Sequence, residues 1–166
     1  MTDYQSEGTQ KVAELIKDAR IAMLTTMTSD GKHVSRPMGL QEVEFDGDLW
    51  FFTKLDSSKA GQIQVNPEVN VSFSDQKHSA WTSISGTAEI SEDKDKMKEL
   101  WNPFIKAWFP DELETPGICL IKVHVDTAEY WDSPGGKVVQ LLGLAKAVVT
   151  GQPADDIGDN KTINLS

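Results

Sequence analysis

The chain has 166 residues, 39% of them hydrophobic, and its 16 basic and 26 acidic side chains give a formal net charge of −10. This composition is typical of a globular protein, and we expect one domain over residues 1–166 with a hydrophobic core of its own. The negative charge and the lack of a basic run argue against binding to nucleic-acid phosphates and against attachment to a membrane surface.

A cytoplasmic location is the simplest interpretation of the sequence. The polar N-terminus lacks the apolar segment of a secretory signal, and no apolar run is long enough to span a bilayer. Cys119 is the single cysteine, which excludes an intramolecular disulfide and a cysteine metal site. Its apolar surroundings, ICLIKV, predict that it is buried.

The first third of the chain predicts one helix and three strands. Apolar residues at helical spacing mark the helix: Val12, Leu15, Ile16 and Ala19. The strands are predicted over residues 21–27, 33–45 and 49–53. An Asp-Gly pair stands in each connection and favours a hairpin turn, so we expect a three-strand meander. Pro37 cannot donate to the sheet and should lie at an edge or a bulge.

The middle of the chain predicts two more strands, over residues 70–75 and 80–91, joined by a polar turn. A helix is expected over residues 92–104. Its apolar stripe consists of Met97, Leu100, Trp101 and Phe104. Pro103 should kink or end this helix, and residues 109–117 read as a loop.

The last third predicts a long half-buried strand over residues 118–132, then a helix over residues 137–149. The apolar face of this helix would consist of Val138, Leu141, Leu142 and Ala145. From Thr150 the chain is polar and expected to be extended. Six mostly antiparallel strands with helices at the ends and crossovers indicate an α+β fold built on a small β-barrel. Alternating βα units are absent, which argues against a Rossmann domain.

Polar and basic side chains gather where the third strand meets a predicted helix start: Arg36, Thr53, Ser57, Ser58 and Lys59. A phosphate group binds to cations, hydroxyls and free backbone N–H groups, and this set could supply all three. The alternative is that Ser57 is only an N-cap, that Lys59 is solvated, and that Arg36 forms a surface ion pair. The residues alone leave both interpretations open.

The strand aromatics predict mainly core packing. Alternation puts Trp50 and Phe52 on one face of their strand and Phe51 on the other. Trp131 differs, because it ends a strand just before SPGG and would lie at the rim of a barrel, where planar ligands meet aromatic side chains.

Common catalytic arrangements are missing from the sequence. The three histidines are scattered, without HExxH or i, i+4 spacing, which argues against a metal site: His33, His78 and His124. No serine stands in a GxSxG elbow. We expect His124 to point outward from its strand. No catalytic residue can be named.

Three segments together resemble the pyridoxamine 5′-phosphate oxidase-like flavin-binding split-barrel family, and within it the bacterial general stress proteins. They are SRPMGLQEVEFDGDLWFFTKLDSSKAGQI, WTSISGTAEI and VDTAEYWDSPGGKV. The resemblance runs from about residue 10 to NKTINLS. It implies a six-stranded antiparallel Greek-key split barrel that forms a homodimer, with FMN, or alternatively FAD, between the subunits.

The resemblance also implies which residues bind the cofactor. Arg36 and Lys59 would hold the FMN phosphate, with Ser58 beside them. The isoalloxazine ring and ribityl chain would contact residues of three strands and of the partner subunit: Pro37, Met38, Gln41, Phe52, Thr53, Trp81 and Trp131.

Two departures from the vitamin B6 oxidases argue against pyridoxine phosphate oxidation. Ser58 stands where those oxidases carry an arginine. They also carry an arginine and a histidine soon after the strand-end tryptophan, where this chain reads WDSPGGKVVQ with Lys137 and Val139.

The resulting prediction is an FMN-binding general stress protein that acts as a flavin-dependent oxidoreductase of unknown substrate, with NAD(P)H as a candidate donor. The alternative is a non-catalytic protein that buffers, stores or senses flavin. A barrel that binds a deazaflavin or haem instead is the minority interpretation.

Overall fold

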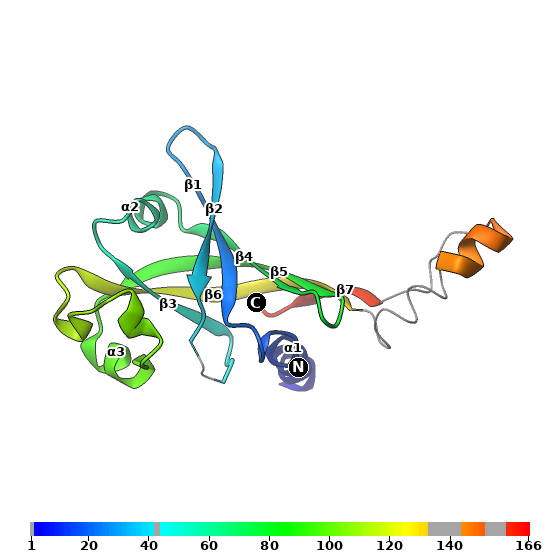
Figure 1. The fold of residues 1–166 in the computed structure, drawn as a ribbon, viewed down its shortest axis with the longest axis horizontal. Coiled ribbons are helices and arrows are strands. Elements are labelled where there is room, and N and C mark those ends of the chain that lie inside the picture. The colour runs from blue at the N-terminus through cyan, green and yellow to red at the C-terminus, as the bar shows by residue number, and fades with distance from the viewer. Residues whose placement is uncertain (1, 42–43, 133–143, 152–158) are drawn as a thin grey trace.

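The computed structural model describes residues 2–41, 44–132, 144–151 and 159–166 (Figure 1). Its elements in chain order are α1 Thr2–Ile16, β1 Ile21–Met27, β2 His33–Gly39, β3 Asp48–Lys54, α2 Ser58–Val65, β4 Glu68–Asp75, β5 Ala80–Ser91, α3 Lys94–Leu100, the 3-10 turns η1 Ile105–Ala107 and η2 Glu112–Glu114, β6 Ile118–Asp132 and β7 Asp159–Asn164. The α+β class is confirmed. The sheet has a seventh strand, β7, in addition to the six that were predicted.

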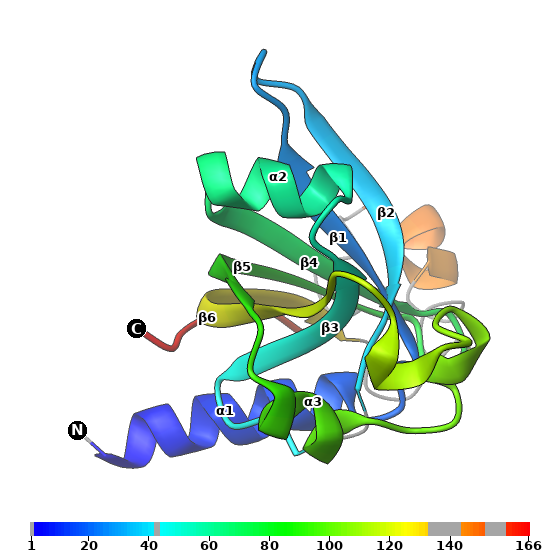
Figure 2. The same cartoon turned by 90° about the vertical axis from the view of Figure 1, so that its left-hand side faces the viewer.

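All strand pairs are antiparallel, and the sheet runs in the order β2-β1-β4-β5-β6-β3, with β7 also paired to β6. β3 and β7 lie end to end along one side of β6, because β3 pairs with its first half and β7 with its second. The sheet curls into a half-barrel whose two ends, β2 and β3, form no ladder with each other along the described strands (Figure 2). This is a split barrel.

The predicted meander is therefore only half correct. β1 and β2 form the expected hairpin, with Gly31 at positive φ in its turn. β3 does not pair with β2 but with β6, from Asp48 opposite His124 to Lys54 opposite Ile118. The Asp-Gly pair before β3 does make a turn, yet the Gly47 carbonyl accepts a hydrogen bond from Val125 N at 2.9 Å. The turn thus binds to β6 instead of closing a hairpin.

The strand predicted over residues 33–45 ends at Gly39, earlier than expected. β1 begins at Ile21, which is paired with Gly39, so the β1–β2 ladder of the described residues stops there. Pro37 lies in β2, an edge strand of the sheet, as predicted. β2 is left open on one side, and this open side faces the groove described below.

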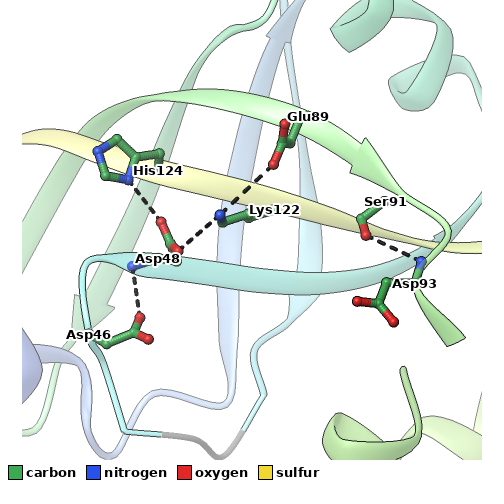
Figure 3. A network of polar contacts seen from close by, with 7 residues as sticks. All are labelled: Asp46, Asp48, Glu89, Ser91, Asp93, Lys122 and His124. Atoms are coloured by element: carbon green, nitrogen blue, oxygen red, sulfur yellow. Dashed lines mark hydrogen bonds and ion pairs between the residues drawn. The ribbon is translucent and has the colours of Figure 1, made fainter. Parts of the chain in front are cut away.

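A polar network fastens the start of β3 to the outer surface of β6 (Figure 3). The Asp48 carboxylate lies 2.9 Å from His124 Nδ1 and 3.3 Å from Lys122 Nζ. Lys122 also reaches Glu89 of β5 at 3.9 Å. The outward direction predicted for His124 is confirmed. Asp48 and Lys122 are partly buried and Glu89 and His124 exposed; each contact contributes little, but together they fix the register of an edge strand that carries groove residues at its far end.

The barrel interior forms the main core. It includes the fully buried side chains of Leu24, Phe51 and Ile84. A second apolar cluster lies on the other face of β3, where Phe52 packs with Ile105, Phe109 and residues of α3. The predicted division of the β3 aromatics between two faces is therefore confirmed, and Cys119 is buried as expected. Apolar clusters therefore pack against both faces of β3 and hold this strand rigidly in place beside the groove.

Helices α1 and α2 lie on opposite sides of the curled sheet (Figure 2). Val12 and Ile16 of α1 are buried against the main core, as the helical spacing predicts. α2 places Ala60 and Ile63 inward. Among the described residues, no helix combines the length and the apolar character needed to cross a lipid bilayer.

The segment after β5 differs in part from the prediction. α3 ends at Leu100, three residues before Pro103, so the expected end of the helix is confirmed. Phe104 does not continue the apolar stripe of α3 and is 49% exposed. The reason is local: the Phe104 N–H donates to the Asn102 side chain at 3.0 Å, and the chain restarts there as a separate turn, η1.

Part of the helix predicted over residues 137–149 is present, because residues 144–150 are helical. They lie apart from the sheet (Figure 1), and Leu144, Val148 and Val149 are exposed. Residues 137–143 of the prediction, with Val138, Leu141 and Leu142, lie outside the described residues. The chain from Thr150 was expected to be extended without being assigned as a strand; Thr150 itself ends the helix, and residues 159–164 are extended and form β7.

Candidate functional site

A groove of about 420 Å³ opens between β2, β3, the start of α2 and the η1 turn. Its size lies within the range of about 300–1,000 Å³ that is common for small-ligand sites. Seven of the ten residues predicted for a site line it: Arg36, Pro37, Met38, Gln41, Phe52, Thr53 and Lys59. The unpaired edges of β2 and β3 form its two walls.

Arg36 reaches from β2 toward α2. Its Nη1 donates to Thr26 Oγ1 at 2.6 Å and to the Leu24 carbonyl at 3.3 Å, and its Nη2 donates to Gln62 Oε1 at 3.2 Å. Thr26 also donates to Gln62 Oε1 at 2.6 Å. A guanidinium has five N–H donors, so these bonds leave two for a ligand. The neutral partners hold the group in place without neutralising it.

Lys59 approaches the same groove from the first turn of α2. Its Nζ donates to Thr53 Oγ1 at 3.2 Å. The pKa of Lys59 lies below its ordinary value, mainly because the amine is partly buried and next because Arg36 repels the charge. Burial also lowers the pKa of Arg36. In the described part of the chain neither cation forms an ion pair with a carboxylate, so an anion in the groove would stabilise both.

The N-terminus of α2 adds backbone donors to this end of the groove. Ser57 is the N-cap, because its Oγ accepts from Ala60 N at 3.4 Å while it donates to the Lys54 carbonyl at 2.7 Å. The first N–H groups of a helix have no partner within the helix and favour anions. Ser58 is the first helical residue, but its side chain is exposed and does not line the groove; Ser57 lies there instead.

The alternative interpretation of this cluster holds only for Ser57, which does cap the helix. Lys59 is partly buried rather than solvated, and Arg36 bonds to neutral groups rather than to a surface carboxylate.

The other end of the groove is apolar. Met38 and Phe52 are buried, and Pro37 and Ile21 extend the apolar lining. Gln41, also buried, folds back onto the Gly39 carbonyl through Nε2 at 3.3 Å. A ligand that combines an anionic group with a flat apolar body would therefore match the two ends.

Trp81 and Trp131 do not line this groove. They are cross-strand partners on β5 and β6, 45% and 40% exposed, and they flank a second hollow of about 290 Å³ on the outer face of the sheet. Ile21 lines both hollows, so the two tryptophans lie on the neighbouring surface.

Several groove residues were not predicted. Phe104 and Trp108 line the apolar end, and Thr26 and Gln62 hold Arg36. The sequence contains a signal for the second pair: Thr26 is a polar residue at an inward position of its strand, in register with Ala22 and Leu24, and Gln62 stands three residues after Lys59, on the same face of α2.

Cys119 lies next to the groove but is not a candidate nucleophile. It pairs with Thr53 in the sheet, is fully buried, and burial raises its pKa to about 11. A thiol in such surroundings stays protonated and inert. Within the described ranges, no cluster of His, Cys, Asp and Glu could hold a metal ion.

Comparison with known proteins places these features in a family. A sequence model described as pyridoxamine 5′-phosphate oxidase like matches residues 7–155. Protein bli-3 of Neurospora crassa is 34% identical over 158 residues, which cover 87% of this chain and 76% of that protein.

Two solved structures have the same fold. General stress protein 26 from Jannaschia sp. CCS1 is 26% identical, with a TM-score of 0.75 and coverage of 96% of this chain and 99% of the other. The general stress FMN/FAD binding protein from Xanthomonas citri is 29% identical, with a TM-score of 0.66 and coverage of 76% and 89%.

Proposed function

This chain belongs to the pyridoxamine 5′-phosphate oxidase-like family, and from that premise we propose that it binds FMN in the groove between β2, β3 and α2 and acts as a flavin-dependent oxidoreductase. Residues 1–166 would act as one flavin-binding domain. The similar Xanthomonas citri protein is described as FMN/FAD binding, which supports a flavin as the ligand. FMN is favoured over FAD because the groove has one cationic end, suited to one terminal phosphate.

One observation carries this proposal: Arg36 and Lys59 line the same groove, each is partly buried, and neither has a carboxylate partner along the described chain. Two cations held this close repel each other, and a phosphate with nearly two negative charges removes that cost. The Arg36 donors not used by protein groups, the Lys59 ammonium and the first N–H groups of α2 are sufficient to satisfy its oxygens.

The remaining groove residues fit the rest of the ligand. Thr53 offers a hydroxyl beside Lys59, suited to the polar ribityl chain. Met38 and Phe52 supply an apolar wall that excludes water from one side of the ring. The redox chemistry would come from the flavin ring when it is bound, while this chain binds and orients it. The donor proposed is NAD(P)H, and the substrate is not pyridoxine phosphate, given Ser58 at the arginine position.

The proposal includes a homodimer in the cytoplasm. Ile21, Met23, Trp81 and Trp131 are exposed apolar residues on the outer face of the sheet, where they would be covered by a second copy. Contact between copies at this face would bring the Trp81–Trp131 pair closer to the flavin groove of the partner.

Three measurements on one preparation test the proposal. FMN should bind with a shift of its visible absorption, NAD(P)H should be oxidised steadily by the FMN-loaded protein, and sedimentation should give twice the chain mass. Tight FMN binding without turnover would instead favour the non-catalytic alternative, a flavin buffer or sensor. A protein that ignores added FMN would contradict both.

A further inference from the structure

The segment of residues 102–109 turns two aromatic rings toward the groove. Ile105 and Phe109 point inward and are buried in the cluster behind β3. Phe104 and Trp108 are 49% and 58% exposed, and they line the groove together with the buried Ile105 and Phe109. Each pair is spaced i, i+4, so the buried pair and the exposed pair lie on different sides of one short turn.

The two exposed rings form a defined surface. Their centroids lie 4.8 Å apart with an interplanar angle of 62°, an edge-type contact. Neighbouring aromatic rings left half exposed in a hollow form an apolar patch of the kind that marks a binding site, and their faces suit a planar ligand. The anchored turn keeps them there, because Ile105 and Phe109 cannot leave the core without opening it.

Hydrogen bonds hold this turn against the end of β2. Asn102 Nδ2 donates to Gln41 Oε1 at 3.1 Å, and Gln41 Nε2 donates to the Gly39 carbonyl at 3.3 Å. A Cβ atom on Gly39 would lie 3.6 Å from Phe104 Cε1, so the ring lies directly over the strand. The turn is thus fixed to the far side of the groove before any ligand arrives.

The spacing along β2 matches a ligand with a charged end and a planar end. Arg36 and Gly39 are three residues apart on an extended strand, which corresponds to about 10 Å. The cations lie at one end of this path and the rings of Phe104 and Trp108 at the other. A phosphate joined through a polyol chain to a flat ring system spans such a distance.

We propose that Phe104 and Trp108, at the β2 end of the groove, form the wall against which the isoalloxazine ring stacks, and that they set the preference of this site for a planar multi-ring ligand. This inference rests on the proposed function, since it assigns the ring end of the same flavin. Gln41 and Asn102 act as positioning residues for the wall.

The test compares FMN with riboflavin, which carries the same ring without the phosphate. Trp108→Ala should weaken both ligands by a similar factor of about five to ten, the usual effect of one lost aromatic contact. Phe104→Ala should act in the same direction, and Trp108→Phe should retain most of the affinity. Arg36→Ala is the contrasting control and should weaken FMN while leaving riboflavin nearly unchanged. Melting temperatures without ligand check that each variant folds.

Each other outcome overturns the inference in a distinct way. Unchanged affinities in Trp108→Ala, with FMN bound normally by the wild-type chain, would remove the stacking wall and leave the proposed function standing. A loss for FMN alone would assign Trp108 to the phosphate end. Unchanged affinities with a loss of association in sedimentation would assign the rings to a subunit interface. Absence of FMN binding by the wild-type chain would refute the proposed function and this inference together.

Discussion

Replacing Arg36 with alanine tests the phosphate end of the site most sharply. The guanidinium has two N–H donors beyond its bonds to Leu24, Thr26 and Gln62. A hydrogen bond to a charged partner contributes about 1–3 kcal/mol, so loss of the guanidinium should raise the Kd for FMN by about 5- to 150-fold. Riboflavin has no phosphate, and its Kd should change by less than about threefold.

The assay is a fluorescence titration of both flavins against matched variants. Lys59→Ala should repeat the pattern, because its ammonium lies at the same end of the groove. Lys32→Ala is the control cation, since Lys32 lies in the β1–β2 turn, exposed and paired with Asp30. It should leave both ligands unchanged.

The difference between the two ligands decides the result. Equal losses for FMN and riboflavin in Arg36→Ala would show that the variant damages the groove as a whole, and the phosphate assignment would be refuted. Because Arg36 also supports Thr26 and Gln62, Arg36→Lys serves as the repair variant: it keeps the charge and should recover part of the FMN affinity.

Three further predictions concern pH, thiol chemistry and stability. The pKa of Lys59 is lowered by burial and by the neighbouring guanidinium. Above that lowered pKa the free amine must take up a proton to bind phosphate, so FMN affinity should fall by more than riboflavin affinity as the pH rises through it, because ionisation of the flavin ring itself at alkaline pH acts on both ligands equally. Parallel curves for the two ligands would contradict this. Cys119, buried and with its pKa raised to about 11, should resist a thiol reagent in the folded protein and react once urea unfolds it; rapid labelling of the native state would refute this. Gly86→Ala should lower the free energy of unfolding by about 1–3 kcal/mol, because its Cβ would clash with the His124 carbonyl oxygen. Gly61→Ala, with open space around it in α2, should raise the free energy of unfolding by about 0.5–1 kcal/mol. The same sign for both in urea denaturation would contradict the packing argument.

Local signals in the sequence predicted local structure well. The Asp30-Gly31 turn gave the β1–β2 hairpin, and the serines after β3 marked the start of α2. The partner of β3 could not be predicted in this way, because β6 lies some seventy residues further on and no turn connects them. β7 was missed for another reason: DNKTIN is polar and mostly exposed, so it carries no alternating apolar pattern.

In the candidate groove, too, contacts between residues distant in the sequence could not be predicted from local signals. Arg36 and Lys59 were expected to lie together because β2 and β3 were expected to pair. They do line one groove, but Arg36 is held through Gln62 of α2, and the strands themselves stay apart. Phe104 was assigned to the apolar stripe of α3, because the periodicity continues past Pro103 although the helix does not. The direction of the Phe104 side chain depends on the hydrogen bond from its N–H to the Asn102 side chain, and the helical spacing of apolar residues carries no signal for that bond.

A crystal structure of the FMN complex would test the central claim most directly. We expect the flavin phosphate between Arg36 and Lys59, with its oxygens within hydrogen-bonding distance of both side chains and of the first N–H groups of α2. A phosphate bound elsewhere, with Arg36 still bonded to Leu24, Thr26 and Gln62 and Lys59 to Thr53 as they are now, would contradict the account.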